Sequence, residues 1–127
     1  MNIRRVAGTK WKGQRTEQTD KSFVQFESLE WGIRAAFCIL DTYRRKYQDV
    51  CVEDIINRWA PPSENDTRKY VETVCRLTGF GGKERLEESQ LPALVYAMAF
   101  VECGAPISKE TISKAYSLYV KLKSNSK

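Results

Sequence analysis

Apolar residues recur at intervals of three and four along most of this chain, which is the spacing that keeps side chains on one face of a helix. Tyr70, Val71, Val74 and Leu77 form one such stripe. The pattern predicts five helices, over about residues 29–47, 52–59, 67–78, 91–103 and 109–123.

Residues that typically begin and end helices support these helix bounds. Ser28 and Ser108 are good N-caps, because a serine oxygen can accept a hydrogen bond from a free backbone N–H in the first turn. Pro61 ends the second helix, since the residue before a proline avoids helical torsions, and Gly79 closes the third. The residues before Ser28 look irregular, and the alternation in 22–26 predicts a short β-hairpin there.

The composition is that of an ordinary globular domain, with 127 residues, 42% hydrophobic and 29% charged. We therefore expect one mostly helical α+β domain over residues 1–127, with about five helices and a small N-terminal β-hairpin. No apolar run approaches the roughly 20 residues that span a bilayer. The N-terminus lacks an apolar stretch behind its basic residues, so we expect no signal peptide and synthesis in the cytoplasm.

The residue content narrows the chemistry that the chain could perform. It has no histidine, which excludes Ser-His-Asp and Cys-His catalysis and mixed Cys/His zinc sites. The four cysteines are widely spaced without a CxxC pair. Cys38, Cys75 and Cys103 lie in apolar helical contexts and are expected to be small buried side chains, with a disulfide left open. We expect no metal site and no cofactor, so any acid–base chemistry must come from Asp, Glu, Tyr, Lys or Cys.

One carboxylate falls where an apolar side chain is expected. Leu94, Val95 and Met98 repeat at helical spacing, and Glu102 continues their face just before a Cys-Gly helix stop. Such a carboxylate must be paired, reach solvent at the helix end, or stay partly neutral as a general acid does. Composition alone leaves these alternatives open.

The segment from Trp59 to Tyr70 is the densest polar-aromatic stretch of the chain. Its rings could stack on sugars while Asn65 and Asp66 bind hydroxyl and amide groups. The alternative is a rigid turn, stiffened by Pro61 and its neighbour, in which Asn65 or Asp66 caps the next helix. Trp11 and the polar residues beside it form a second aromatic-polar cluster, which could bind a ligand in the same way. The alternative is that its aromatic side chains hold an N-terminal lobe together.

Positive charge is concentrated at the two ends of the chain. Residues 1–15 carry five Lys and Arg and no acid, and 109–127 carry five Lys and one Glu, while the stretch between them is acidic. This distribution favours weak attraction to a polyanion, or it serves solubility only. The basic residues form no obvious recognition helix, so nucleic acid is a disfavoured partner.

A series of motifs runs along nearly the whole chain: Asn2-Ile3-Arg4, Trp11-Lys12-Gly13, Phe23-Val24-Gln25-Phe26, Glu30-Trp31-Gly32-Ile33-Arg34-Ala35, and the string from Ile55 through Trp59-Ala60-Pro61 and Glu64-Asn65-Asp66-Thr67 to Tyr70. Together they resemble a family of small phage and prophage proteins of the P5 type, often labelled virion or structural proteins. The last string is the most specific of them. The resemblance implies other virion proteins as partners and association with a virion.

A second resemblance concerns the order of the motifs. Asn2-Ile3-Arg4 followed by Trp11-Lys12-Gly13 is similar to the segment after the catalytic helix in cell-wall glucosaminidases and other lysozyme-like wall-degrading enzymes. Tyr70 looks like their substrate-side tyrosine. The helix that ends in Glu102 comes later here, so a lysozyme-like fold would be circularly permuted.

This second resemblance implies cleavage of a peptidoglycan glycan strand, with Glu102 as general acid/base and release of the protein to the cell wall. Glu64 is the expected second catalytic carboxylate, with Asp66 and then Glu27 as its alternatives. A lytic transglycosylase would need Glu102 alone. The expected substrate-binding residues are Trp11, Trp59, Asn65, Asp66 and Tyr70. The alternative function is a non-catalytic virion structural or wall-binding protein of the same fold.

Overall fold

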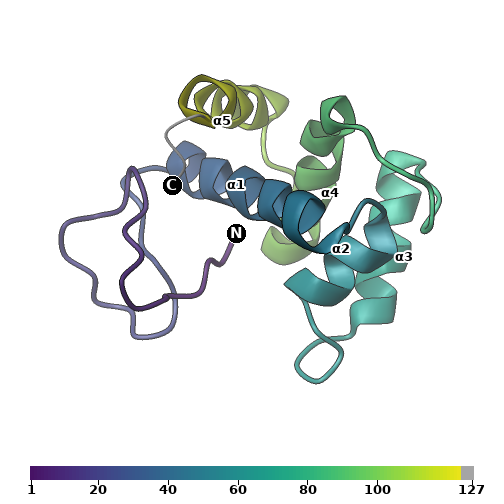
Figure 1. The fold of residues 1–127 in the computed structure, drawn as a ribbon, viewed down its shortest axis with the longest axis horizontal. Coiled ribbons are helices and arrows are strands. Elements are labelled where there is room, and N and C mark those ends of the chain that lie inside the picture. Colours follow the sequence, from purple (N-terminus) through teal and green to yellow (C-terminus); the bar gives the residue numbers. More distant parts are fainter. Residues whose placement is uncertain (124–127) are drawn as a thin grey trace. The chain divides into compact units, whose positions relative to one another are not determined.

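The computed structural model of the chain describes residues 1–123. Its elements, shown in Figure 1, are α1 (Leu29–Tyr47), α2 (Val52–Trp59), α3 (Thr67–Thr78), the short 3-10 helix η1 (Glu88–Gln90), α4 (Leu91–Cys103) and α5 (Lys109–Leu122). The mostly helical fold and the five predicted α-helices are confirmed.

The helix ends follow from local side-chain chemistry. The Asp66 side chain accepts a hydrogen bond from the Lys69 N–H (3.2 Å) at the start of α3, and Ser108 caps α5 in the same way. Gly79 and Gly104 have left-handed torsions, with φ of 81° and 72°, and end α3 and α4. These ends are therefore encoded within one turn of each boundary.

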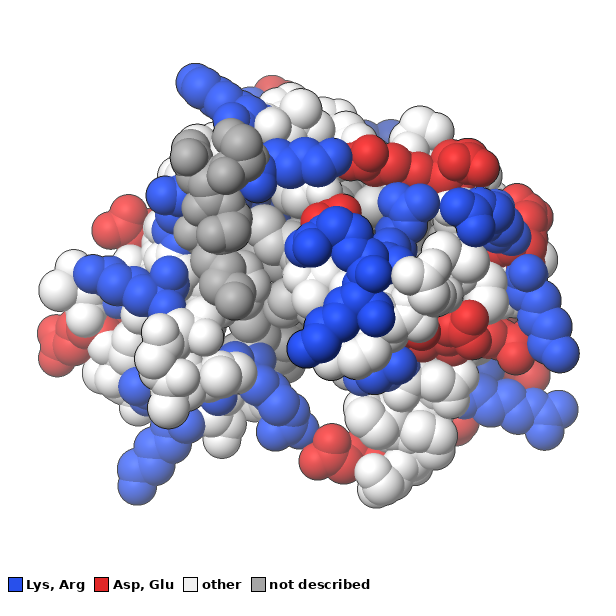
Figure 2. Space-filling model, viewed as in Figure 1, with Lys and Arg blue, Asp and Glu red and all other residues white. Residues whose placement is uncertain are grey.

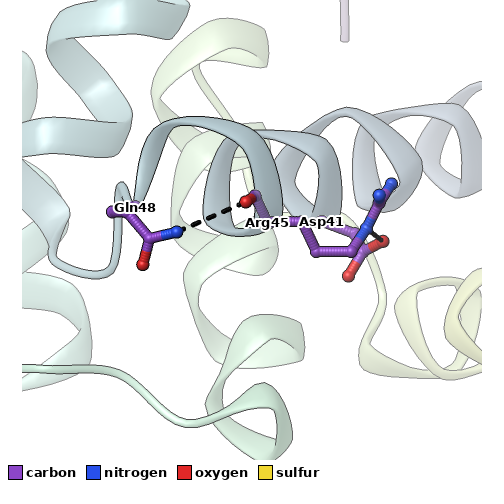
Figure 3. A network of polar contacts seen from close by, with 3 residues as sticks. All are labelled: Asp41, Arg45 and Gln48. Carbon is purple, nitrogen blue, oxygen red and sulfur yellow. Dashed lines mark hydrogen bonds and ion pairs between the residues drawn. The ribbon is translucent and has the colours of Figure 1, made fainter.

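Helix α1 ends without a glycine. Gln48 adopts a positive φ of 60°, and its side-chain Nε2 donates to the carbonyl oxygen of Arg45 in the last turn (3.4 Å), as Figure 3 shows. One turn earlier, Arg45 Nε donates to Asp41 Oδ2 over 2.8 Å. The amide side chain of Gln48 thus serves one of the carbonyl groups that a helix end leaves without an N–H partner.

The segment before α1, which we call the N-terminal lobe (residues 3–27), contains two isolated antiparallel bridges and no regular strand. The bridges join Arg4 to Phe23 and Gln14 to Phe26. Residues 22–26 are therefore paired on both sides, by a hydrogen bond from Val24 N to the carbonyl of Ile3 and by one from Arg15 N to that of Gln25. Each pairing is too short to form the ladder of the expected β-hairpin.

Backbone contacts divide the chain into two compact units, unit 1 with Met1–Ile39 and the residues from Ser108 onward, and unit 2 with Leu40–Ile107. In unit 1, Phe37 of α1 packs against Tyr116 and Tyr119 of α5, with ring centroids 5.1 and 5.7 Å apart. The single domain expected over residues 1–127 stays a prediction.

In unit 2, α3 packs against α2 and α4. The core between these helices is formed by side chains with no exposed surface, among them Ile55, Ile56, Val74, Leu94 and Met98. Burial of each such side chain stabilises the fold by about 1.5–3 kcal/mol. Within residues 1–123, no helix is long and apolar enough to cross a bilayer.

Candidate functional site

Three side chains from three helices of unit 2 meet at one carboxylate oxygen. Glu102 Oε2 accepts a hydrogen bond from Trp59 Nε1 over 2.8 Å and another from the Tyr70 hydroxyl over 2.6 Å. Trp59 is the last residue of α2, Tyr70 lies in the first turn of α3, and Glu102 lies in the last turn of α4. We call these three residues the Glu102 cluster.

The turn between α2 and α3 positions two of the three residues. The Thr67 hydroxyl donates to the carbonyl oxygen of Ala60, which ties the start of α3 to the end of α2. Thr67 is buried, and so is most of the Tyr70 side chain. The two donors to Glu102 are thereby held by backbone that is fixed at both helix ends.

Glu102 occupies an unfavourable place in its own helix. Carbonyl groups without partners give the last turn of α4 a partial negative charge, which opposes a carboxylate there. The hydrogen bonds from Trp59 and Tyr70 offset this repulsion, since bonds to a charged acceptor are stronger than neutral ones. Glu102 is thus half-buried and has two hydrogen-bond partners, which is the pairing that the sequence left open as one alternative.

Tyr70 is the more constrained of the two donors. Burial, the nearby charge of Glu102 and the hydrogen bond to it, in that order, raise the pKa of the Tyr70 hydroxyl above its ordinary value. Its single hydrogen goes to Glu102, because the other acceptor in reach, the Met98 carbonyl, is 3.4 Å away. Tyr70 therefore remains a protonated donor at neutral pH.

The turn between the two helices carries the other predicted residues of unit 2. Asn65 and Asp66 line a groove of about 550 Å³ with Glu53, Asn57, Arg68 and Glu72. Asn65 Nδ2 also donates to the carbonyl of Pro61 (3.2 Å), and Asp66 caps α3, as expected of a rigid turn. Glu64 is exposed on the same turn, and its place as a second carboxylate stays a prediction.

Trp11 belongs to unit 1, and its side chain is only 7% exposed. Its backbone N–H donates to Gln14 Oε1 over 3.0 Å, within the N-terminal lobe. The ring is buried, which is compatible with the alternative interpretation of this cluster. A role for Trp11 in sugar stacking stays a prediction.

Sequence reasoning selected all three members of the Glu102 cluster but missed the groove residues Glu53 and Asn57. Their spacing of four residues on α2 was the available signal, because it places both on one helix face. All four cysteines are free thiols. Among the residues described, no three acidic or cysteine side chains are grouped so that they could bind a metal ion.

The fold is that of a small helical protein, and the sequence comparison relates it to a bacteriophage protein. Over 110 residues the chain is 37% identical to Protein P5 of Pseudoalteromonas phage PM2, a match that covers 86% of this chain and 69% of that protein. The chain belongs to the family of this Protein P5, and the first resemblance is confirmed to that extent. No protein-family model matches it.

Proposed function

We propose that the chain is a phage-derived peptidoglycan-cleaving domain in which Glu102 acts as general acid/base. The observation that supports it best is the Glu102 cluster: a half-buried carboxylate at a helix end, held by Trp59 and Tyr70. A glycosidase needs a carboxyl group fixed beside the bond that it protonates. The Glu-ended helix and the order of the similar motifs favour a circularly permuted lysozyme-like fold.

The cluster suggests how the proton is carried. Both hydrogen bonds from Trp59 and Tyr70 fall on Oε2, so a proton that Glu102 delivers to a glycosidic oxygen is carried on Oε1. Trp59 and Tyr70 then act as positioning residues, which fix the plane of the carboxyl group. Once the proton has left, the same two donors stabilise the negative charge.

The products depend on whether a second carboxylate takes part. In a hydrolase, Glu64 would activate water or attack the sugar, with Asp66 as its alternative, and sugars with reducing ends are released. In a lytic transglycosylase a hydroxyl of the substrate replaces the second carboxylate, and anhydro ends appear. Asn65 and Asp66 would bind the amide and hydroxyl groups of the glycan strand in either case.

The second candidate is a non-catalytic virion structural or wall-binding protein of the same fold. One observation favours it: Glu102 already joins α2, α3 and α4 through its two hydrogen bonds, which is a structural task that requires no substrate. Other virion proteins would then be its partners, in keeping with its membership of a phage protein family.

A digestion of isolated peptidoglycan by the purified chain separates the two candidates. Glu102→Gln keeps a carbonyl oxygen that can accept both hydrogen bonds, so it preserves the cluster, but it cannot deliver a proton. We expect it to lower the release of muropeptides at least about 100-fold. The matched control is Glu110→Gln on α5, which makes the same chemical change at an exposed position and keeps full activity.

Cleavage that survives Glu102→Gln contradicts the catalytic assignment. If the unaltered chain releases nothing from peptidoglycan, the result contradicts the catalytic proposal and favours the structural candidate. Mass spectrometry of the products distinguishes anhydro from reducing ends.

A further inference from the structure

Charge is divided unequally between the two units. Unit 1 contains twelve Lys and Arg against five Asp and Glu, and unit 2 contains nine against eleven. The net formal charges are therefore +7 and −2. The Glu102 cluster lies entirely within the unit of slightly negative charge, so attraction of an anionic ligand has its source in the other unit.

The N-terminal lobe, which carries much of this positive charge, is a folded part of unit 1. Ile3 and Trp11 are buried in it, at 3% and 7% exposure. The side chains of Gln18 and Gln25 bind backbone groups across the lobe, and Gln18 Nε2 donates to the carbonyls of Arg15 (2.8 Å) and Gln25 (2.7 Å). Its basic side chains are therefore displayed on a fixed backbone.

We define the basic set as five side chains of this lobe, namely Arg5, Lys10, Lys12, Arg15 and Lys21. Four of them are exposed, and Lys12 is half-buried. None of the five forms an ion pair with a carboxylate of the described residues. Arg5 donates instead to the backbone carbonyl of Asp20, whose carboxylate accepts from the N–H groups of its own turn.

Three of the six arginines of unit 2 behave differently. Arg45, Arg58 and Arg68 are each paired with a carboxylate, at 2.8, 2.5 and 3.3 Å. In the face that Figure 2 presents, Lys and Arg side chains project in greater number than Asp and Glu. The positive charge of the basic set is thus available to an external anion, whereas that of these three arginines is already matched.

We propose that the basic set binds the carboxylate groups of peptidoglycan stem peptides and holds the chain on the wall independently of the Glu102 cluster. The choice of polymer rests on the proposed function. The lobe itself argues against nucleic acid, because Trp11 is buried and unavailable for base stacking, and none of the five basic residues lies on a helix. Acidic Glu17 and Asp20 are interspersed among them in the sequence and would oppose a continuous phosphate backbone.

The test measures binding in the Glu102→Gln background, so that the wall is not consumed. Co-sedimentation with purified peptidoglycan is compared for this chain and for the same chain with Lys10→Gln, Lys12→Gln and Arg15→Gln. We expect the triple change to weaken binding about tenfold at low salt, and binding of the parent to fall as salt rises. Circular dichroism verifies that both chains are folded.

The matched control removes three exposed basic residues of unit 2, through Lys69→Gln, Arg76→Gln and Lys83→Gln. This variant has the same change in net charge as the first triple variant. We expect it to weaken binding to peptidoglycan by less than about twofold, because these side chains lie outside the basic set. Peptidoglycan whose carboxylates have been converted to amides should lose the binding.

Three results would overturn the proposal: an equal loss in the control variant, undiminished binding to amidated peptidoglycan, or tighter binding to duplex DNA than to peptidoglycan. Failure of the proposed function has a different signature. In that case the unaltered chain binds peptidoglycan but releases no muropeptides from it.

Discussion

Tyr70 donates its hydroxyl hydrogen to Glu102 over 2.6 Å and so joins the first turn of α3 to the last turn of α4. Both partners depend on the contact. The Tyr70 hydroxyl is buried, and without an acceptor it would destabilise the folded state. The Glu102 carboxylate lies at the negative end of its own helix and needs the donor. This pair is therefore the most sensitive polar contact of the cluster.

Tyr70→Phe should destabilise the protein by about 1.5–3 kcal/mol, which is the usual net value of a hydrogen bond to a charged group. Urea unfolding followed by circular dichroism measures it. The matched control is Tyr116→Phe on α5, where a half-buried hydroxyl is removed far from Glu102 in sequence, and the change should stay below about 0.5 kcal/mol. Equal effects of the two substitutions would contradict the importance of the pair.

The raised pKa of Tyr70 predicts a specific alkaline effect. In the unfolded chain the hydroxyl ionises near its ordinary pKa of 10.0, whereas in the folded protein it remains protonated at that pH. The stabilisation is thus complete below pH 10 and is lost as pH rises further, by up to about 1.4 kcal/mol per pH unit. The difference in unfolding free energy between the unaltered chain and Tyr70→Phe should shrink between pH 10 and 11, and a constant difference would contradict the assignment.

Gly13→Ala should disrupt the N-terminal lobe. Gly13 has a φ of 77°, and an added Cβ would come within 2.1 Å of Cγ of Trp31, so the indole must move. Gly8→Ala is the matched control, since its φ is 82° but no atom lies within 4 Å of the added carbon. We expect Gly8→Ala to lower the free energy of unfolding by about 1–2 kcal/mol, as measured by thermal unfolding. Gly13→Ala should lower it by clearly more.

Cys103 should be the first thiol to react with Ellman's reagent. It is exposed at the end of α4, whereas burial raises the pKa of the Cys51 and Cys75 thiols and lowers their thiolate fraction. One fast phase is therefore expected under native conditions, and Cys103→Ser should abolish it. A fast phase that persists in this variant would place another thiol at the surface.

The helices could be predicted because their signals are local. Ser108, Gly79 and Gly104 each specify a helix end within one turn, and the apolar stripes specify the buried faces. The N-terminal lobe could not be predicted in the same way. Residues 22–26 pair with a segment on each side, and alternation within a single strand does not identify two separate partners.

The sequence singled out the three residues of the Glu102 cluster but could not reveal their contacts. Glu102 drew attention as a carboxylate on an apolar face, which indicated that it needed a partner. Its partners Trp59 and Tyr70 are 43 and 32 positions away in the sequence, so only the packing of α2, α3 and α4 could bring them together. A sequence pattern identifies the carboxylate that needs a hydrogen-bond partner, and the tertiary structure identifies which side chains donate to it.

The division into two units also affects the order in which the parts of the protein can form their contacts during synthesis. Unit 2 is one uninterrupted stretch from Leu40 to Ile107, so all of its residues have been translated before α5 is made. Unit 1 draws on both sides of that stretch, and Phe37 has no aromatic partners until Tyr116 and Tyr119 emerge. The part of the chain that is translated first therefore lacks its aromatic contacts with α5 until α5 has been made, and a chain truncated near residue 107 would lack these contacts altogether.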